Sequence, residues 1–186
     1  MTRLPPMVIL DRDGVINEDS DEFIKSPEEW IPIPGSLEAI ARLNNAGVLV
    51  TVATNQSGIG RGLLSADTLN QIHAKFQRAL TRVGGHIDGI FFCPHTPEEG
   101  CKCRKPEPGL LQAISRRFAI PLVDVPFIGD TARDVETAVA AGAMPMLVGT
   151  GKGRHTRETH PELHELPWFD DLESAVDALM LAAERR

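Results

Sequence analysis

The chain has 186 residues, 42% hydrophobic and 24% charged, which is enough to bury the core of one globular domain without disulfide bonds. A formal net charge of −7, no tyrosine and only two tryptophans argue against broad binding of nucleic acids or anionic membranes. We therefore expect a single domain over residues 1–186 that binds neither. Only residues 7–10 form an apolar run before charge begins, too short for a signal peptide, so we expect a cytoplasmic, reducing environment.

The first half of the chain alternates short apolar runs with amphipathic segments. We expect strands at residues 7–10, 48–54 and 87–93, and helices at residues 36–47 and 65–85. In the longer helix an apolar residue recurs every three or four positions, which predicts one buried face. That face consists of Leu69, Ile72, Phe76, Leu80 and Val83.

The second half repeats this alternation. We expect helices at residues 108–118, 132–143 and 172–184, a strand at 125–129 and a final strand at 144–149, which Pro145 weakens. Residues 154–168 carry no motif and are predicted to be a surface connection. Short apolar strands alternating with helices predict a doubly wound, Rossmann-like parallel sheet with helices on both faces.

Residues suited to catalysis follow the predicted strands. The sequence DRDG follows the first strand, TNQSG the second and GDTARD the fourth. Ligands of open α/β sheets bind at the carboxyl ends of strands. Asp11 and Asp13 repel each other unless a cation is near, and Asp130 would add a third carboxylate, with Asp134 a turn further on. Such hard oxygen ligands favour Mg²⁺. A single aspartate at such a position is often only a helix cap or a turn residue. That explanation does not fit four aspartates that all follow predicted strands.

All three cysteines lie in one stretch, CPHTPEEGCKCRKP. Cys93, His95, Cys101 and Cys103 offer four ligands for a tetrahedral Zn²⁺, and four protein ligands leave no open catalytic position. We therefore predict a structural zinc loop at residues 93–103, followed directly by Arg104 and Lys105. Two alternatives fit the sequence less well. Cysteines that bind no metal would not be expected to gather in this one stretch, and no other cysteine occurs in the chain. A nucleic-acid-binding finger is disfavoured because the chain is acidic.

These segments together resemble the haloacid dehalogenase (HAD) superfamily of phosphohydrolases. Its four motifs are matched in order, by Asp11-x-Asp13-Gly14, Thr54, Lys105 and Gly129-Asp130-x-x-x-Asp134. The resemblance implies that Asp11 is the nucleophile, that Asp13 is the general acid and base, and that Thr54 and Lys105 stabilise the phosphoryl group. Mg²⁺ would be held by the Asp11 carboxylate, the Asp13 backbone carbonyl and Asp130. Asp134 would orient Lys105 or a metal-bound water.

The gaps between the motifs are too short for a cap domain, so we expect a capless enzyme. The sequences ILDRDGVIN, TNQSGIGRG and CPH…CKCRKP are similar to the bacterial heptose-bisphosphate phosphatase family. This family removes the 7-phosphate of D-glycero-D-manno-heptose 1,7-bisphosphate, in biosynthesis of nucleotide-activated heptose for lipopolysaccharide. The implied substrate contacts are Asp11, Arg12, Asp13, Asp19, Ser20, Asp21, Glu22, Thr54, Asn55, Gln56, Ser57, Arg104 and Lys105.

The chain departs from the family at two places. EDSDEF stands where some members have a His-Gly-Tyr segment, which leaves the preferred anomer open, and Thr131 stands where some have lysine. A related alternative is histidinol-phosphate phosphatase, which has an aspartate where this chain has Ser57. An alternative of another class is a phospho-accepting receiver domain of signalling proteins. We expect a monomer that acts on a small phosphorylated sugar.

Overall fold

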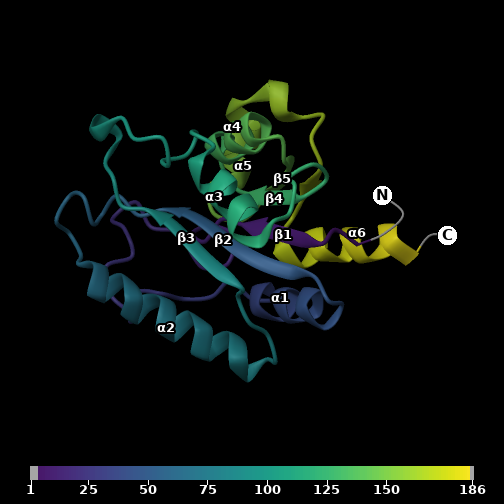
Figure 1. The fold of residues 1–186 in the computed structure, drawn as a ribbon, viewed down its shortest axis with the longest axis horizontal. Coiled ribbons are helices and arrows are strands. Elements are labelled where there is room, and N and C mark those ends of the chain that lie inside the picture. The colour runs from purple at the N-terminus through teal and green to yellow at the C-terminus, as the bar shows by residue number, and fades with distance from the viewer. Residues whose placement is uncertain (1–3, 185–186) are drawn as a thin grey trace.

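Six parallel strands form one sheet in the order β3–β2–β1–β4–β5–β6, with helices on both faces (Figure 1). The computed structural model describes residues 4–184. The strands are β1 (Met7–Leu10), β2 (Leu49–Asn55), β3 (Gly89–Cys93), β4 (Pro126–Gly129), β5 (Met144–Val148) and β6 (Trp168–Phe169). The α-helices are α1 (Ser36–Asn45), α2 (Ala66–Arg82), α3 (Gly109–Phe118), α4 (Ala132–Ala141), α5 (Gly153–Thr159) and α6 (Leu172–Glu184). The predicted doubly wound α/β fold is confirmed.

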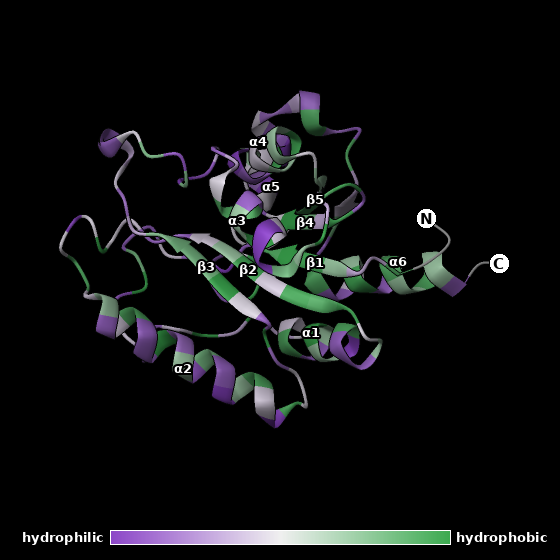
Figure 2. Ribbon diagram, viewed as in Figure 1, coloured by the Kyte–Doolittle hydropathy of each residue, from purple (hydrophilic) through white to green (hydrophobic). Residues whose placement is uncertain are grey.

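Strand β1 supplies side chains to both cores. Val8 and Leu10 pack into the core under α1, α2 and α6, whereas Met7 and Ile9 pack into the core under α3 and α4. All four are fully buried, as expected for the central strand of a sheet covered on both faces. Figure 2 shows hydrophobic residues, in green, along the strands of the sheet. Apolar strands and helices with one apolar face therefore close two cores around one sheet.

One part of the predicted apolar face of α2 was wrong. Leu69, Ile72, Phe76 and Leu80 are fully buried, but Val83 is 37% exposed. The helix ends at Arg82, and Gly84 turns the chain away with a φ of 80°. Val83 therefore lies beyond the helix and does not continue its apolar face.

The strand order locates the crevice in which such sheets bind ligands. The chain winds from β1 through β2 to β3, then returns to β4 on the other side of β1 and winds outward to β6. A crevice opens outside the strand ends where the winding reverses, between β1 and β4. The amide of Asp11 donates to the Ile128 carbonyl at this point, at 2.9 Å. Receiver domains have the order 2-1-3-4-5, so the receiver alternative is excluded.

No cap domain interrupts the described chain. Between β1 and β2 there is a loop and α1, and between β2 and Lys105 there are α2, β3 and the Cys/His loop. The loop after β1 is anchored by Trp30, whose ring is buried and lies 5.4 Å from the Phe76 ring. Among residues 4–184, no helix is long and apolar enough to cross a membrane.

The predictions for the C-terminal third needed correction. Residues 154–168 are mostly exposed, as expected of a surface connection, but they also include most of α5 and the 3₁₀ turn Pro161–Leu163 and enter β6, which the sequence did not predict. Strand β5 is therefore not the last strand, since Leu147 pairs with Trp168 and Val148 with Phe169. A strand of two residues has no readable periodicity, and its pairing depends on a neighbour 21 positions earlier.

Candidate active site

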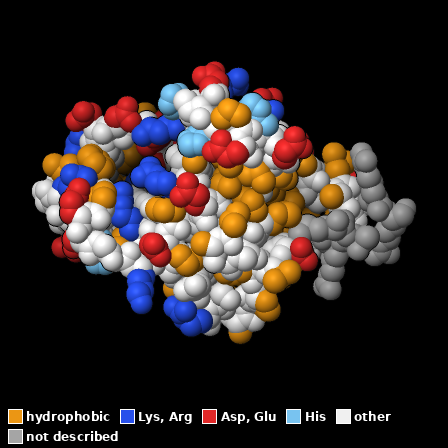
Figure 3. Space-filling view, turned by 90° about the horizontal axis from the view of Figure 1, so that it is seen from above, with side chains coloured by type: hydrophobic (Ala, Val, Ile, Leu, Met, Phe, Trp, Pro, Cys, Tyr) orange, Lys and Arg blue, Asp and Glu red, His pale blue; other side chains and the backbone are white. Residues whose placement is uncertain are grey.

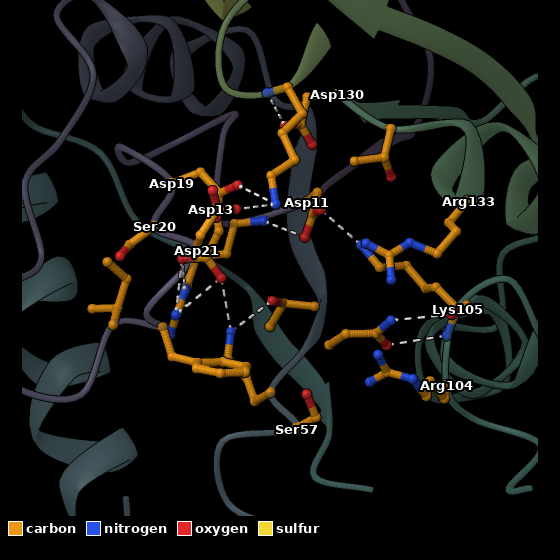
Figure 4. A pocket seen from close by; sticks show the side chains of 18 of the residues that line it. Asp11, Asp13, Asp19, Ser20, Asp21, Ser57, Arg104, Lys105, Asp130 and Arg133 are labelled. Carbon is orange, nitrogen blue, oxygen red and sulfur yellow. Dashed lines mark hydrogen bonds and ion pairs between the residues drawn. The ribbon is translucent and has the colours of Figure 1, made fainter. Parts of the chain in front are cut away.

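A cleft of about 260 Å³ lies at the carboxyl ends of the strands (Figure 4). Its walls come from five separate segments: the turns after β1, β2, β4 and β5, and the segment that follows the Cys/His loop. The lining includes the sequence-predicted residues Asp11, Arg12, Asp13, Asp19, Ser20, Asp21, Thr54, Asn55, Gln56, Ser57, Arg104, Lys105 and Asp130. The fold thus brings together the motifs that the sequence placed at strand ends.

Lys105 links two carboxylates at the base of this cleft. Its ammonium lies 2.8 Å from Asp11 Oδ2 and 2.6 Å from Asp134 Oδ1, and the lysine is only 3% exposed. Burial by itself would lower the pKa of Lys105, but Asp11 and Asp134 raise it above its ordinary value. Lys105 is therefore a fixed positive charge beside Asp11.

Asp134 is fully occupied by hydrogen bonds. Its second oxygen accepts from the amide and the hydroxyl of Thr131, at 3.0 and 2.6 Å, which also caps the start of α4. With its first oxygen on Lys105, neither oxygen is free for a substrate. The carboxylate can thus position Lys105, one of the two roles expected for it.

Asp11 and Asp130 make a site suited to a hard cation. Carboxylate oxygens of Asp11, Asp130 and Asp134 all lie within 4.8 Å of one another. Burial, together with repulsion from the neighbouring carboxylates, raises the pKa of Asp11 to about 7 and that of Asp130 to about 8. Lys105 opposes this rise at both residues. A bound cation would relieve the same repulsion, so the donor set fits Mg²⁺.

The approach of Asp130 to the first strand depends on Gly14. A Cβ atom on Gly14 would collide with the Asp130 carboxylate, and Gly14 has a φ of 82°. The backbone amide of Lys152 holds the same carboxylate by donating to Oδ2 at 2.7 Å. Gly14 is therefore needed for the close approach of Asp130 as well as for the turn after β1.

The Asp13 carboxylate is held by three neighbours. Arg12 Nη2 lies 2.9 and 3.0 Å from its two oxygens, and amide groups of Asn17 and Gln56 each donate at 2.9 Å. Burial raises the pKa of Asp13, but Arg12, Asn17 and Gln56 outweigh it and hold that pKa below its ordinary value. Its side chain is outside the carboxylate cluster of Asp11, so only its backbone carbonyl is a candidate for the cation.

The end of β2 fixes the backbone of Lys105. Asn55 Nδ2 donates to the Lys105 carbonyl at 3.1 Å, and the Lys105 amide donates back to Asn55 Oδ1 at 3.0 Å. Gln56 Nε2 donates to Thr54 Oγ1 at 2.9 Å. Thr54 and Ser57 are buried at the cleft, whereas the amide of Asn55 is committed to holding Lys105.

The four predicted zinc ligands converge. The three sulfur atoms of Cys93, Cys101 and Cys103 lie 3.3–3.6 Å apart, and His95 Nδ1 lies 3.5 and 3.3 Å from the Cys93 and Cys103 sulfurs. Tetrahedral zinc with Zn–S bonds of about 2.3 Å would place sulfur ligands roughly 3.7 Å apart. These residues therefore fit a four-coordinate structural zinc site.

The loop after β1 forms an acidic side of the cleft. Asp19 and Asp21 line it together with Ser20, and Lys152 Nζ lies 3.3 Å from Asp19 and 2.9 Å from Asp21. The structure does not bring Glu22 into the cleft, since it is exposed and does not line it. Lys152 thus connects this loop to the turn that holds Asp130.

Sequence reasoning missed several lining residues. The cleft is also lined by six residues that the sequence did not single out: Phe23, Ile24, Arg61, Thr131, Arg133 and Lys152. The signal for Lys152 was its place in GTGKG, a glycine-rich turn directly after β5, where the strand-end rule applies. Arg61 and Arg133 lie within segments that were recognised as functional, but nothing local distinguishes them from surface arginines.

Comparison with known proteins agrees with this geometry. Residues 102–175 match the family model described as HAD-hydrolase-like. A D-glycero-β-D-manno-heptose-1,7-bisphosphate 7-phosphatase of Bordetella bronchiseptica is 57% identical over 150 residues, covering 81% of this chain and 84% of the relative. The chain belongs to the D-glycero-β-D-manno-heptose-1,7-bisphosphate 7-phosphatase family.

Other members of this heptose-bisphosphate phosphatase family match over nearly the whole chain. The Pseudomonas putida relative is 51% identical over 175 residues, covering 94% of this chain and 99% of the relative. The crystal structure of the B. bronchiseptica D,D-heptose 1,7-bisphosphate phosphatase complexed with magnesium and phosphate matches with a TM-score of 0.92 and 50% identity. That match covers 95% of this chain and 99% of the other. The resemblance to the heptose-bisphosphate phosphatase family is thereby confirmed.

Proposed function

We propose that this chain hydrolyses the 7-phosphate ester of D-glycero-β-D-manno-heptose 1,7-bisphosphate. The observation that carries the proposal is the convergence of Asp11, Asp130 and Lys105 in one cleft of a capless fold. The choice of sugar and of the β anomer rests on the names of the relatives. An open cleft without a cap suits a substrate that carries charge at both ends.

Asp11 is the nucleophile of the proposed reaction. An oxygen of its carboxylate attacks the phosphorus of the 7-phosphate, and the bond from phosphorus to the sugar oxygen breaks, which leaves an aspartyl-phosphate. Lys105, held by Asp11 and Asp134, stands beside the oxygens on which charge develops. The Thr54 hydroxyl, at the end of β2, is a second donor to these oxygens.

Asp13 transfers protons in both halves of the reaction. It first protonates the departing sugar oxygen, then takes a proton from water as that water attacks the phosphorus and releases Asp11. In the structure both its oxygens accept hydrogen bonds from Arg12, Asn17 or Gln56. The Asp13 side chain must therefore rotate out of these contacts to reach the sugar oxygen.

Two metal ions complete the proposal. Asp11, Asp130 and the Asp13 backbone carbonyl would hold Mg²⁺, which supplies positive charge to a phosphoryl oxygen. The magnesium and phosphate in the B. bronchiseptica structure support this ion. Cys93, His95, Cys101 and Cys103 would hold a structural Zn²⁺, which fixes the segment carrying Arg104 and Lys105.

The experiment that tests the proposal is a comparison of kcat/KM for three substrates. These are the α and β anomers of heptose 1,7-bisphosphate, and histidinol phosphate as the substrate of the related alternative. We expect the β anomer to have the highest kcat/KM. A tenfold or greater preference for histidinol phosphate would overturn the choice of sugar but not the choice of Asp11.

A further inference from the structure

Arg12 carries a positive charge that has almost no contact with solvent. On the face of the molecule shown in Figure 3, Lys and Arg side chains stand at the surface and gather toward one end. Arg12, in contrast, is 1% exposed, although it belongs to the wall of the cleft. A buried guanidinium needs partners for its N–H groups inside the protein. The partners of Arg12 therefore indicate what its charge does.

Each nitrogen of the Arg12 guanidinium has a partner within the protein. Nε donates to Asp13 Oδ1 at 3.1 Å, and Nη2 donates to both Asp13 oxygens, at 2.9 and 3.0 Å. The third nitrogen, Nη1, lies 3.3 Å from Nε2 of His73. These contacts favour a role for Arg12 toward Asp13 over the direct substrate contact that the resemblance implies.

His73 presents an uncharged ring to Arg12. It lies on the buried face of α2, and its ring meets that of Phe92 on β3 in a T-shaped arrangement, with centroids 6.3 Å apart. Burial and the Arg12 charge lower the pKa of His73 to about 4, so the ring is neutral at neutral pH. For Nε2 to accept from Arg12, the ring proton has to be on Nδ1. His73 can thus hold the one guanidinium nitrogen that Asp13 does not use.

The backbone next to Asp13 is fixed, so its carboxylate moves by rotation of the side chain. The Arg12 carbonyl accepts from the amides of Ile16 and Asn17, at 2.9 and 3.2 Å, in a tight turn after β1. When the Asp13 side chain rotates toward the sugar oxygen, the Arg12 guanidinium loses its anionic partner. Within residues 4–184, His73 is the only other side chain that forms a hydrogen bond with this guanidinium. It is therefore the contact that keeps Arg12 in place while Asp13 is away.

We propose that His73 and Arg12 are positioning residues that set the Asp13 carboxylate for proton transfer to the sugar oxygen. His73 fixes Arg12, and Arg12 returns the Asp13 carboxylate to one place after each rotation. This inference rests on the proposed function, and it brings α2, a helix that carries none of the four motifs, into the reaction. Loss of either residue should matter most for esters whose leaving group needs a proton.

The test compares two leaving groups through kcat/KM, which covers the reaction up to departure of the leaving group. The sugar oxygen of heptose 1,7-bisphosphate has to be protonated as it departs, whereas the phenolate of p-nitrophenyl phosphate departs without a proton. We expect His73→Leu to lower kcat/KM ~10-fold more for the heptose ester than for the nitrophenyl ester. His73→Gln keeps an acceptor for Arg12 and should recover most of this loss. His86→Leu, at an exposed histidine outside the cleft, is the matched control and should change neither value.

A second background shows whether His73 acts through Asp13. Asp13→Asn cannot serve as a general acid, so adding His73→Leu to it should lower kcat/KM for the heptose ester no further. Equal losses on the two esters, or a full additional loss in the Asp13→Asn background, would overturn the positioning role. If the wild type preferred histidinol phosphate, the proposed sugar would fail, and the same dependence on the leaving group measured with histidinol phosphate would support His73.

The tautomer of His73 gives a readout that does not need turnover. Two-dimensional ¹H–¹⁵N NMR of the wild-type protein at neutral pH should show a proton on Nδ1 of His73 and none on Nε2. Arg12→Met should shift the Nε2 resonance, with the fold intact by circular dichroism. A proton on Nε2 in the wild type would overturn the contact between His73 and Arg12, even if the proposed reaction were confirmed.

Discussion

Arg12 forms an ion pair with the carboxylate of its neighbour Asp13, in which Arg12 Nη2 lies 2.9 Å from one oxygen and 3.0 Å from the other. Arg12 is only 1% exposed, so this ion pair forms largely out of water. Its other terminal nitrogen, Nη1, lies 3.3 Å from Nε2 of the buried His73 on α2. A helix that contributes nothing else to the proposed chemistry thus helps to orient the residue assigned to proton transfer.

His73 should make the stability of the protein depend on pH. Burial and the Arg12 charge lower the pKa of His73 from 6.5 to about 4. Between these two pH values His73 is therefore protonated in the unfolded chain but neutral in the folded chain. Stability therefore falls as pH falls through that window, by an amount on the order of 3 kcal/mol. Urea unfolding of wild type and His73→Gln from pH 7 to 4.5, in excess Mg²⁺, measures the difference. The variant should lose less stability than the wild type, and parallel curves would contradict this account.

Mg²⁺ should stabilise the protein more strongly at high pH. The pKa values of Asp11 and Asp130 are raised from 3.8 to about 7 and about 8, so the folded chain keeps protons that the unfolded chain has lost. Stability without metal then falls as pH rises through this range, and the metal must displace these protons to bind. The increase in Tm on adding Mg²⁺ should be larger at pH 8 than at pH 6. Asp130→Asn should abolish most of it, and an equal increase at both pH values would refute the coupling.

Asp11→Asn should remove turnover and spare the fold. An amide cannot attack phosphorus, so we expect kcat to fall by at least ~10³-fold. The variant also removes a buried carboxylate with a raised pKa, so in metal-free protein at pH 8 its Tm should not decrease. Asp67→Asn, exposed at the start of α2, is the matched control for both measurements. Activity of Asp11→Asn near the wild-type level would disprove the nucleophile.

Cys101→Ser should act through the segment that follows the loop. Losing one of four ligands weakens the predicted zinc site, which leaves the Lys105 backbone held by the Asn55 amide group and the Arg104 side chain held by the His95 carbonyl. We expect zinc content and kcat/KM to fall together, while the Mg²⁺ dissociation constant changes little. Lys102→Gln, exposed in the same loop, serves as the control. Full activity in zinc-free protein would remove this role.

Lys152 should affect substrate binding more than stability. Its side chain is 46% exposed, so its pairs with Asp19 and Asp21 contribute little to folding. Without the lysine, two unpaired carboxylates would face an anionic substrate. Lys152→Met should therefore raise KM for the bisphosphate by roughly 3- to 10-fold with Tm nearly unchanged, while Lys152→Arg should retain binding. If Lys152→Met lowered kcat without raising KM, the lysine would act on a step other than substrate binding.

Much of the fold could be read from short segments. Buried strands such as β1 and amphipathic helices such as α2 have periodicities that local sequence carries in full. Strand β6 could not be read, because two residues become a strand only by pairing with β5. Val83 was misplaced because a pattern of spacing does not show where a helix stops.

The sequence by itself determined which chemical groups this protein has at its strand ends: two aspartates after β1, a third after β4, and a cysteine–histidine loop before a lysine. It could do so because each motif lies within a few consecutive residues. Only the tertiary structure decided which partners those groups have. Lys105 meets Asp134, Lys152 meets Asp21, and four arginines share a cleft, because the strand order brings together side chains that are from 29 to 131 positions apart. Distances of that kind depend on the order and direction of strands, which no local pattern encodes.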